Sequence, residues 1–176
     1  MPEFIMEGRD HAARAESPFV LGFIEAMFFT ECSPAYMSDE WLSDECKEAQ
    51  EQGQADGTLP GDVGYCDLHP DSLAKIRAFC ETFQRDNAAL LAQAYARPDY
   101  DETQAGRDLW FTSQGHGVGF WDRKQLDCPG HVGTGHVGPG LSIAQSLSDA
   151  ARYHEANVWF ADHVTYGNAP FVQVEI

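Results

Sequence analysis

Basic residues are scarce in this sequence. Its 176 residues include 11 Lys and Arg against 28 Asp and Glu, which gives a formal net charge of −17. Non-specific nucleic-acid binding depends on neutralising phosphates with basic side chains, and anionic membrane surfaces attract clusters of the same residues. We therefore expect no direct nucleic-acid binding and no membrane binding. A basic protein is the partner that suits this charge, and the oligomeric state stays open.

The sequence also lacks CxxC pairs, a signal peptide and a long apolar run. Its five cysteines are an odd number and stand apart, so they cannot all pair within one chain. The longest apolar stretch, residues 19–29, is shorter than the roughly 20 residues that span a bilayer. These absences predict a reducing, cytoplasmic location. Buried thiols are the expectation for Cys80 and Cys32.

Apolar residues are plentiful enough for a core, at 43% of the chain with 12% aromatic. We expect a single domain over 1–176, with residues 1–16 as a weakly ordered lead-in and 17–97 as a helical, strongly acidic part. Ser17 and Pro18 favour a helix start, and apolar spacing continues it to about Glu31. Further helices are predicted over 39–52 and over 70–96.

The part from 106 to 176 has a different, β-rich pattern. Aromatic runs bounded by glycine predict a hairpin of strands 109–112 and 118–121. A helix over 141–154 and strands at 158–161 and 171–174 follow. The predicted fold class is α+β, with N-terminal helices packed on a small antiparallel β-sheet and one further helix. We interpret the large aromatic residues of these strands as core: Trp110, Phe120, Trp121 and Trp159.

Negative charge is concentrated in the N-terminal part. Residues 1–105 carry a net −14, and residues 36–71 alone carry a net −9. A helix over 39–52 would align four acids on one face, where each like-charged neighbour pair costs roughly 0.2–0.5 kcal/mol. Such a face is either a solvated surface or a docking face for a basic partner that imitates a row of phosphates. The candidate partner-binding residues are Glu40, Asp44, Glu48, Glu51, Asp56 and Asp62.

A loop rich in glycine contains the weak metal candidates. Cys128, His131 and His136 fall within nine residues, and His116 or His163 would add a fourth zinc-type ligand. The spacing matches no standard zinc pattern, so we predict no cofactor and keep zinc as the alternative. His116 beside Asp122 would suit a general base, but a histidine bonded to backbone is the commoner outcome. We therefore name no catalytic residue and favour binding over catalysis.

The segment Asp108-Leu-Trp-Phe-Thr-Ser-Gln-Gly-His-Gly-Val-Gly-Phe-Trp-Asp-Arg123 resembles a family of small uncharacterised proteins of tailed bacteriophages and prophages. Members of that family have an N-terminal helical part and a comparable "LTRNGHGAGFWDR" hairpin. Residues 23–29 and 73–91 are also similar, and the resemblance covers most of 17–166. The chain departs from it at Ser113-Gln114, where Arg-Asn is usual, and in its long 127–140 loop.

The resemblance implies a phage or mobile-element origin and an accessory role in the cytoplasm of an infected bacterium. Combined with the charge, it predicts a protein that acts by binding, as an acidic, DNA-mimic-like inhibitor of a host nucleic-acid-binding or defence protein. The alternative is a metal-dependent enzyme or metal-binding protein that uses the loop of Cys128, His131 and His136.

Overall fold

The computed structural model describes residues 11–33, 59–60, 64–128, 131–132, 135–136, 141–152, 154–161 and 171–176. Its α-helices are α1 (Pro18–Glu31), α3 (Pro70–Asp86), α4 (Ala88–Tyr95), α5 (Glu102–Ser113) and α6 (Ile143–Ala151). Its strands are β1 (Cys32–Ser33), β2 (Leu59–Pro60), β3 (His131–Val132), β4 (Gly135–His136), β5 (Asn157–Ala161) and β6 (Phe171–Glu175). Short 3-10 turns occur at His11–Ala15, Tyr65–Asp67, Phe120–Asp122 and Lys124–Leu126.

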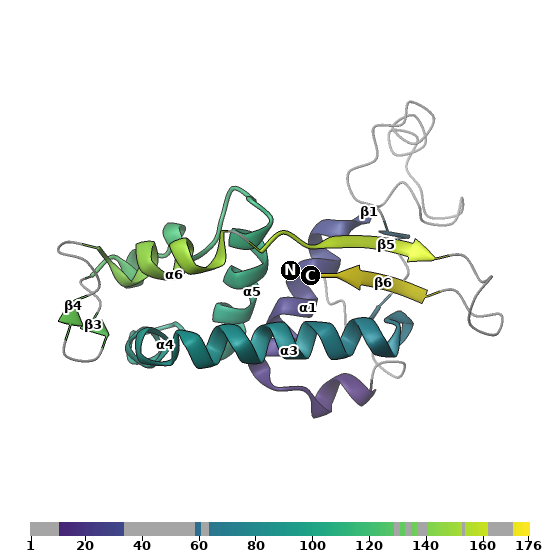
Figure 1. Cartoon of the computed structure of the whole chain (residues 1–176), viewed down its shortest axis with the longest axis horizontal. Helices are drawn as coiled ribbons and strands as arrows, with labels where there is room; N and C mark the ends of the chain where they lie inside the picture. Colours follow the sequence, from purple (N-terminus) through teal and green to yellow (C-terminus); the bar gives the residue numbers. More distant parts are fainter. Residues whose placement is uncertain are drawn as a thin grey trace.

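The fold class is α+β, as the sequence predicts. β5 and β6 form an antiparallel pair in which Val158 lies opposite Val174, and α3 packs along β6. Figure 1 shows α3 beside this hairpin, with α6 towards the other end of the molecule and α1 and α5 behind them. Leu68 forms a single parallel bridge with Val172 of β6, where His69 N donates to Val172 O, and Val174 N donates to the Ser72 hydroxyl of α3.

α1 is the central helix of the core rather than a helix with one apolar face. Eight of its 14 residues are buried, and they are distributed around the helix axis. The Phe23 ring forms edge-to-face pairs with two other rings, those of Phe79 on α3 and Trp110 on α5. The indole N–H of Trp110 donates to Thr30 Oγ1 at 2.8 Å, which satisfies the polar atom of a fully buried ring.

Two glycines allow α1 and α5 to approach backbone to backbone. A Cβ atom built on Gly22 would lie 2.1 Å from the carbonyl oxygen of Thr103, and one on Gly106 would lie 1.9 Å from that of Phe19. Neither contact can be relieved by rotating a side chain, because the obstructing atoms belong to the main chain. The ion pair between Arg107 and Glu25, at 2.6 Å, joins the same two helices. We call this close contact of α1 with α5, at Gly22 and Gly106, the seam.

The predicted hairpin of strands 109–112 and 118–121 is wrong. Residues 109–112 lie inside α5, and 120–122 form a 3-10 turn. Asp101 begins the helix as its N-cap by accepting a hydrogen bond from Gln104 N at 2.8 Å. The aromatic run is buried on nearly every side of α5, so β propensity gives way to helical packing.

Three other predictions need correction. The helix expected over 70–96 is two helices separated at Asn87, whose side chain donates to Phe83 O. Part of the expected lead-in is ordered, since residues 11–15 form a 3-10 turn in which Ala13 is fully buried, and Glu16 forms an ion pair with Arg77. Trp121 and Trp159 are 53% and 43% exposed, whereas Trp110 and Phe120 lie in the core as expected.

The helix predicted from Ser17 and the strands predicted at 158–161 and 171–174 are confirmed, as is the core of the helix predicted over 141–154. The predicted helix 39–52 lies outside the described residues. Within the described part of the chain, no helix is both long and apolar enough to cross a membrane.

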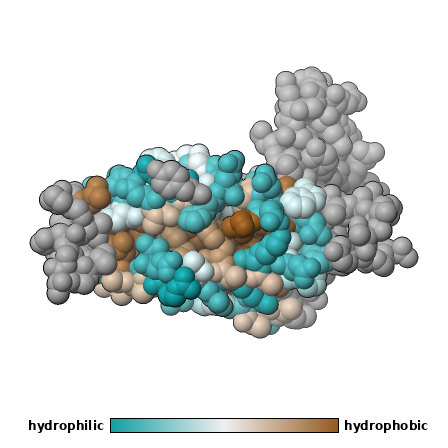
Figure 2. Space-filling view, in the orientation of Figure 1, coloured by the Kyte–Doolittle hydropathy of each residue, from teal (hydrophilic) through white to brown (hydrophobic). Residues whose placement is uncertain are grey.

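Figure 2 shows an apolar band in the middle of one face, surrounded by hydrophilic residues. Between α3 and α6 lies a hollow of about 260 Å³, lined by Phe79, Phe83, Ala150 and His154 among others.

Candidate functional site

A buried ion pair joins the two ends of the segment 108–123. Asp108 on α5 is fully buried, and the side chain of Arg123, which follows the 3-10 turn at 120–122, is 23% exposed. Arg123 donates from Nε to Asp108 Oδ1 and Oδ2 at 2.9 and 3.0 Å, and from Nη2 to Oδ1 at 2.6 Å. This forked geometry fixes the direction of the guanidinium as well as its distance.

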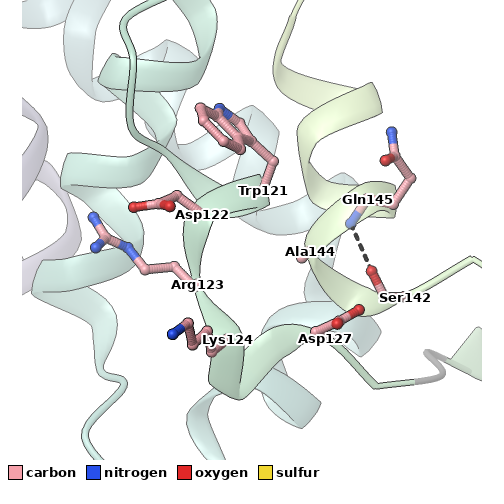
Figure 3. Close-up of a pocket in the computed structure, with 8 residues that line it drawn as sticks. All are labelled: Trp121, Asp122, Arg123, Lys124, Asp127, Ser142, Ala144 and Gln145. Carbon is pink, nitrogen blue, oxygen red and sulfur yellow. Dashed lines mark hydrogen bonds between the residues drawn. The ribbon is translucent and has the colours of Figure 1, made fainter.

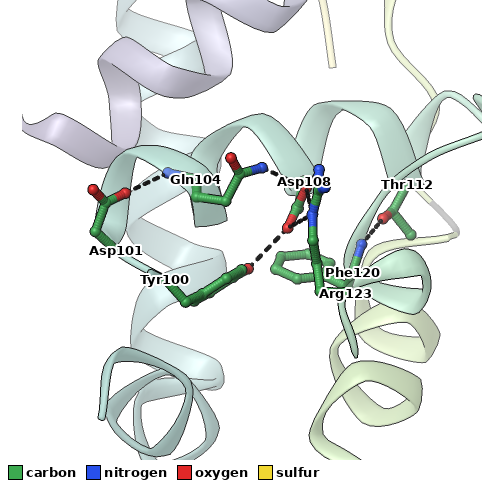
Figure 4. A network of polar contacts seen from close by, with 7 residues as sticks. All are labelled: Tyr100, Asp101, Gln104, Asp108, Thr112, Phe120 and Arg123. Carbon is green, nitrogen blue, oxygen red and sulfur yellow. Dashed lines mark hydrogen bonds and ion pairs between the residues drawn. The ribbon is translucent and has the colours of Figure 1, made fainter. Parts of the chain in front are cut away.

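Two further donors complete the coordination of the Asp108 carboxylate, as Figure 4 shows. Tyr100 Oη donates to Oδ2 at 3.0 Å, and Gln104 Nε2 donates to Oδ1 at 2.9 Å. A buried carboxylate is costly unless its charge is paired and its oxygens are hydrogen-bonded. Here both conditions hold, so the network fastens the 119–123 segment to α5.

The titration of this network follows from its burial. Burial raises the pKa of the Asp108 carboxyl, and the hydrogen bonds from Arg123, Gln104 and Tyr100 oppose that rise. Hydrogen bonding to Asp108 raises the pKa of the Arg123 guanidinium. Burial, with the charge of Asp108, also raises the pKa of the Tyr100 phenol. The Arg123 cation therefore persists across the physiological range, with its charge balanced locally.

A glycine with an unusual backbone conformation brings the segment back to α5. Gly119 has a φ of 155°, and a Cβ atom there would meet Thr112 Oγ1 at 2.3 Å. The same hydroxyl accepts a hydrogen bond from Phe120 N at 3.1 Å, while the Phe120 ring stacks on Phe83 with centroids 5.8 Å apart. The next residue, Trp121, is thereby directed to the surface.

Beside this network lies a surface hollow of about 300 Å³. Its walls are the segment after α5 and the beginning of α6, and its lining comprises Trp121, Asp122, Arg123, Lys124, Asp127, Ser142, Ala144 and Gln145. Figure 3 shows the indole of Trp121 on one side and the Asp127 carboxylate, extended toward Ser142, on another. The charged ends of Arg123 and Lys124 both lie away from Gln145, that of Arg123 beside the Asp122 carboxylate and that of Lys124 separate from it.

Among the described residues, the free charged groups of the hollow are the carboxylates of Asp122 and Asp127 and the ammonium of Lys124. Within the described structure, the carboxylates of Asp122 and Asp127 make no hydrogen bond or ion pair. The amide nitrogen of Gln145 donates to Asp149 at 2.9 Å, which leaves its oxygen free. Ser142 Oγ accepts from Gln145 N as the N-cap of α6. No lining residue forms the nucleophile and base pair that acyl transfer needs.

The structure brings together only part of the predicted metal set. The backbones of His131 and His136 lie directly opposite each other in the β3–β4 pair. Cys128 is half-buried, and its thiol donates weakly to Gln125 O at 3.9 Å. His116 donates from its backbone N–H to Phe111 O, its ring lies edge-on to Phe111, and its Nε2 is buried without a partner in the described structure. Among the described residues, no three His, Cys, Asp or Glu side chains form a metal-binding group.

The remaining sequence candidates divide into those that the structure describes and those that it does not. The acids proposed to bind a partner lie outside the described residues: Glu40, Asp44, Glu48, Glu51, Asp56 and Asp62. His116 makes no hydrogen bond with Asp122 in the described structure, so the geometry offers no support for a base assisted by Asp122. The buried thiol predicted for Cys80 is confirmed, and burial raises its pKa.

Sequence reasoning missed the hollow and the ion pair. Asp108 and Arg123 stand at the two ends of the segment 108–123. Their opposite charges were therefore a signal in the sequence for the ion pair. Asp127, Ser142 and Gln145 carry no such signal, because only the packing of α6 places them beside Trp121. In the comparisons with known proteins, no family model, curated protein or solved structure matches the chain.

Proposed function

We propose that this protein is a non-enzymatic binding protein of phage or mobile-element origin that occupies a basic, nucleic-acid-binding host protein. The observation that carries the proposal is the distribution of charge. Residues 34–63 contain eight Asp and Glu against one Lys. A segment with this excess attracts a basic surface and speeds the encounter with it.

The charges of the residues that the structure describes, which we call the described body, support the same proposal. Its residues include 16 Asp and Glu and nine Lys and Arg. Six of those nine bases form ion pairs with acids of the same chain: Lys75, Arg77, Arg85, Arg107, Arg123 and Arg152. The body therefore offers little free positive charge that would neutralise the acidic segment or repel a basic partner.

Capture from a bacterial lysate tests the proposal. Immobilised protein should retain a basic, nucleic-acid-binding protein at low salt and release it at roughly 0.5 M salt, where Debye screening shortens electrostatic attraction to a few ångströms. A column carrying an unrelated acidic protein of equal net charge controls for simple ion exchange. If the retained proteins are the same on both columns, or none is basic, the proposal fails.

The metal-binding alternative has one observation in its favour. The β3–β4 register sets the backbone of His131 directly opposite that of His136. Elemental analysis of protein grown with zinc and purified without a histidine tag tests it. A structural site should be nearly full, so less than about 0.2 zinc per chain would reject the alternative.

A further inference from the structure

We propose that the hollow beside Trp121 is a binding site for an arginine side chain. The proposal begins with the exposure of Trp121, whose side chain is 53% accessible although its neighbour Phe120 is fully buried. An exposed indole face attracts cations through its quadrupole, and arginine is the cation that most often uses it. The network of Asp108 and Arg123 holds the adjoining backbone, so the indole is attached to a fixed support.

The polar atoms of the hollow select a ligand that donates hydrogen bonds. Asp122 and Asp127 can only accept, and the free oxygen of Gln145 also accepts, since its amide nitrogen is already bonded to Asp149. A guanidinium has five N–H donors and no acceptor, and its planar fork matches a carboxylate. An anionic or acceptor-rich ligand would leave these oxygens unpaired.

The two bases in the lining do not reverse this selection. The guanidinium of Arg123 is bonded to the buried Asp108 carboxylate, which balances its charge. Figure 3 shows the ends of Arg123 and Lys124 on the side of the hollow away from Gln145 and Ser142. With Arg123 balanced by Asp108, the carboxylates of Asp122 and Asp127 stand against Lys124 alone, so the lining keeps one net negative charge.

The dimensions favour a single side chain. A volume of about 300 Å³ is at the lower end of the range for small-molecule sites. The methylene groups of an arginine would cover Ala144, and the guanidinium would stack on the Trp121 indole with its edge directed to Asp127. Lysine fits less well, because an ammonium group cannot stack on the ring or form two parallel hydrogen bonds to a carboxylate.

This inference deepens the proposed function and rests on it for the source of the ligand, since a basic host protein would supply the arginine. Direct titration of the full chain tests it without that partner. The probes are a capped arginine and a capped citrulline, which has nearly the same shape but no charge. The readout is the backbone and indole N–H shifts of 15N-labelled protein, with the Trp121 indole assigned from Trp121→Phe.

We expect capped arginine to produce saturable shifts at Trp121, at 122–127 and at 142–145, with an affinity on the order of 1 mM. Capped citrulline should bind at least tenfold more weakly. Asp127→Asn should weaken arginine binding about fivefold and Trp121→Ala at least tenfold, as expected for a lost ion pair and a lost cation–π contact. The matched control, Trp159→Ala, removes an exposed indole of β5 and should leave the affinity unchanged.

Equal binding of arginine and citrulline, shifts confined to other surfaces, or full affinity in Trp121→Ala would each overturn the inference. The dispersed spectrum of each variant shows that it is folded. The two proposals can fail separately. Arginine binding without capture of a basic host protein would leave the site and remove the proposed function, whereas capture without arginine binding would do the reverse.

Discussion

The two faces of α5 perform different tasks within the same 12 residues. One face presents Gly106 to the backbone of α1, at a distance that excludes any side chain. The other presents Gln104, Asp108 and Thr112 at intervals of four residues, and each forms a hydrogen bond with another polar group. We call these three residues the polar stripe. The first face is a constraint of shape, and the second is a constraint of charge and hydrogen bonding.

This difference between the two faces explains how α5 holds a surface site in a fixed position. The seam with α1 fixes α5 in the core, and the polar stripe then fastens residues 119–123 to the opposite side of the same helix. A fault in the seam should therefore affect the whole molecule. A substitution in the polar stripe should also free the 119–123 segment, and with it Trp121 and the hollow. Substitutions on the two faces of α5 should therefore differ in their effect on the position of Trp121.

The largest effect is expected from Arg123→Met, which leaves the Asp108 carboxylate buried without its cation. Removing one partner of a buried ion pair costs about 3–5 kcal/mol. The free energy of unfolding, measured by urea titration, should fall by that amount. The matched control is Arg85→Met, whose pair with Asp86 is exposed and should change the free energy of unfolding much less.

A double variant sharpens this prediction. Asp108→Asn together with Arg123→Met removes both charges, so its loss of stability should be at least about 1 kcal/mol smaller than the sum of the two single losses. Simple additivity would show that the two side chains act independently and would contradict the account of the polar stripe.

Gly106→Ala, in the seam, should lower the stability of the fold almost as strongly. The added methyl group would lie 1.9 Å from the Phe19 carbonyl oxygen, so α1 and α5 must separate. Overpacking of this kind costs about 1–3 kcal/mol, although alanine is favoured over glycine in a helix by roughly 1 kcal/mol. Gly117→Ala, where nothing lies within 4 Å, is the control. Equal melting temperatures for the two variants would be incompatible with close helix contact.

Alkaline pH should weaken the attachment of the N-terminal turn to α3. Tyr65 Oη donates to Glu16, which also pairs with Arg77. Burial and the hydrogen bond to Glu16 raise the pKa of Tyr65 to about 12. Because this pKa exceeds the ordinary value near 10, the stabilisation is complete below pH 10 and is lost as pH rises toward 12.

The expected loss is up to about 2 kcal/mol, measured by urea unfolding between pH 9 and 12. Tyr65→Phe should reduce this pH dependence, and an unchanged profile in that variant would assign the effect elsewhere. At acid pH the sign is opposite. Hydrogen bonding to Arg77 lowers the pKa of Glu16, so its stabilisation is present above the ordinary carboxyl pKa and is lost as pH falls below it.

Several elements of the fold could be predicted from the sequence because their signals are local. The Ser17-Pro18 start of α1 and the short runs of β-branched and aromatic residues in β5 and β6 are examples. α5 could not be recognised from periodicity, because its residues from 105 to 113 are buried on nearly every side except at Arg107. Asp101 with Gln104 three residues later was the local signal for its start.

The candidate site was less predictable than the fold for a physical reason. Asp127 and Gln145 become neighbours only through tertiary packing, and their sequence surroundings have no motif. Charge excess, by contrast, is a property of composition, so the acidic segment is evident without a structure. Its role in partner binding stays a prediction, because Glu40, Asp44, Glu48 and Glu51 lie outside the described residues.

The smallest effect on stability is expected from replacing these four acids by glutamine or asparagine. If residues 39–52 are helical, the change removes three repulsive neighbour pairs and should raise the free energy of unfolding by up to about 1 kcal/mol. A matched variant, Glu81→Gln, Asp86→Asn, Glu102→Gln and Glu155→Gln, removes four exposed charges of the described body. A fall of more than about 1 kcal/mol in the first variant would show that these acids form stabilising contacts.

The most direct test of the central claim is the rate at which each four-charge variant associates with the captured basic protein at low salt. Steering by opposite charge acts on the encounter, so the account predicts at least tenfold slower association when Glu40, Asp44, Glu48 and Glu51 are neutralised. The matched variant should lose much less. Wild-type association by the first variant, or equal slowing by both, would contradict a docking role for the acidic segment.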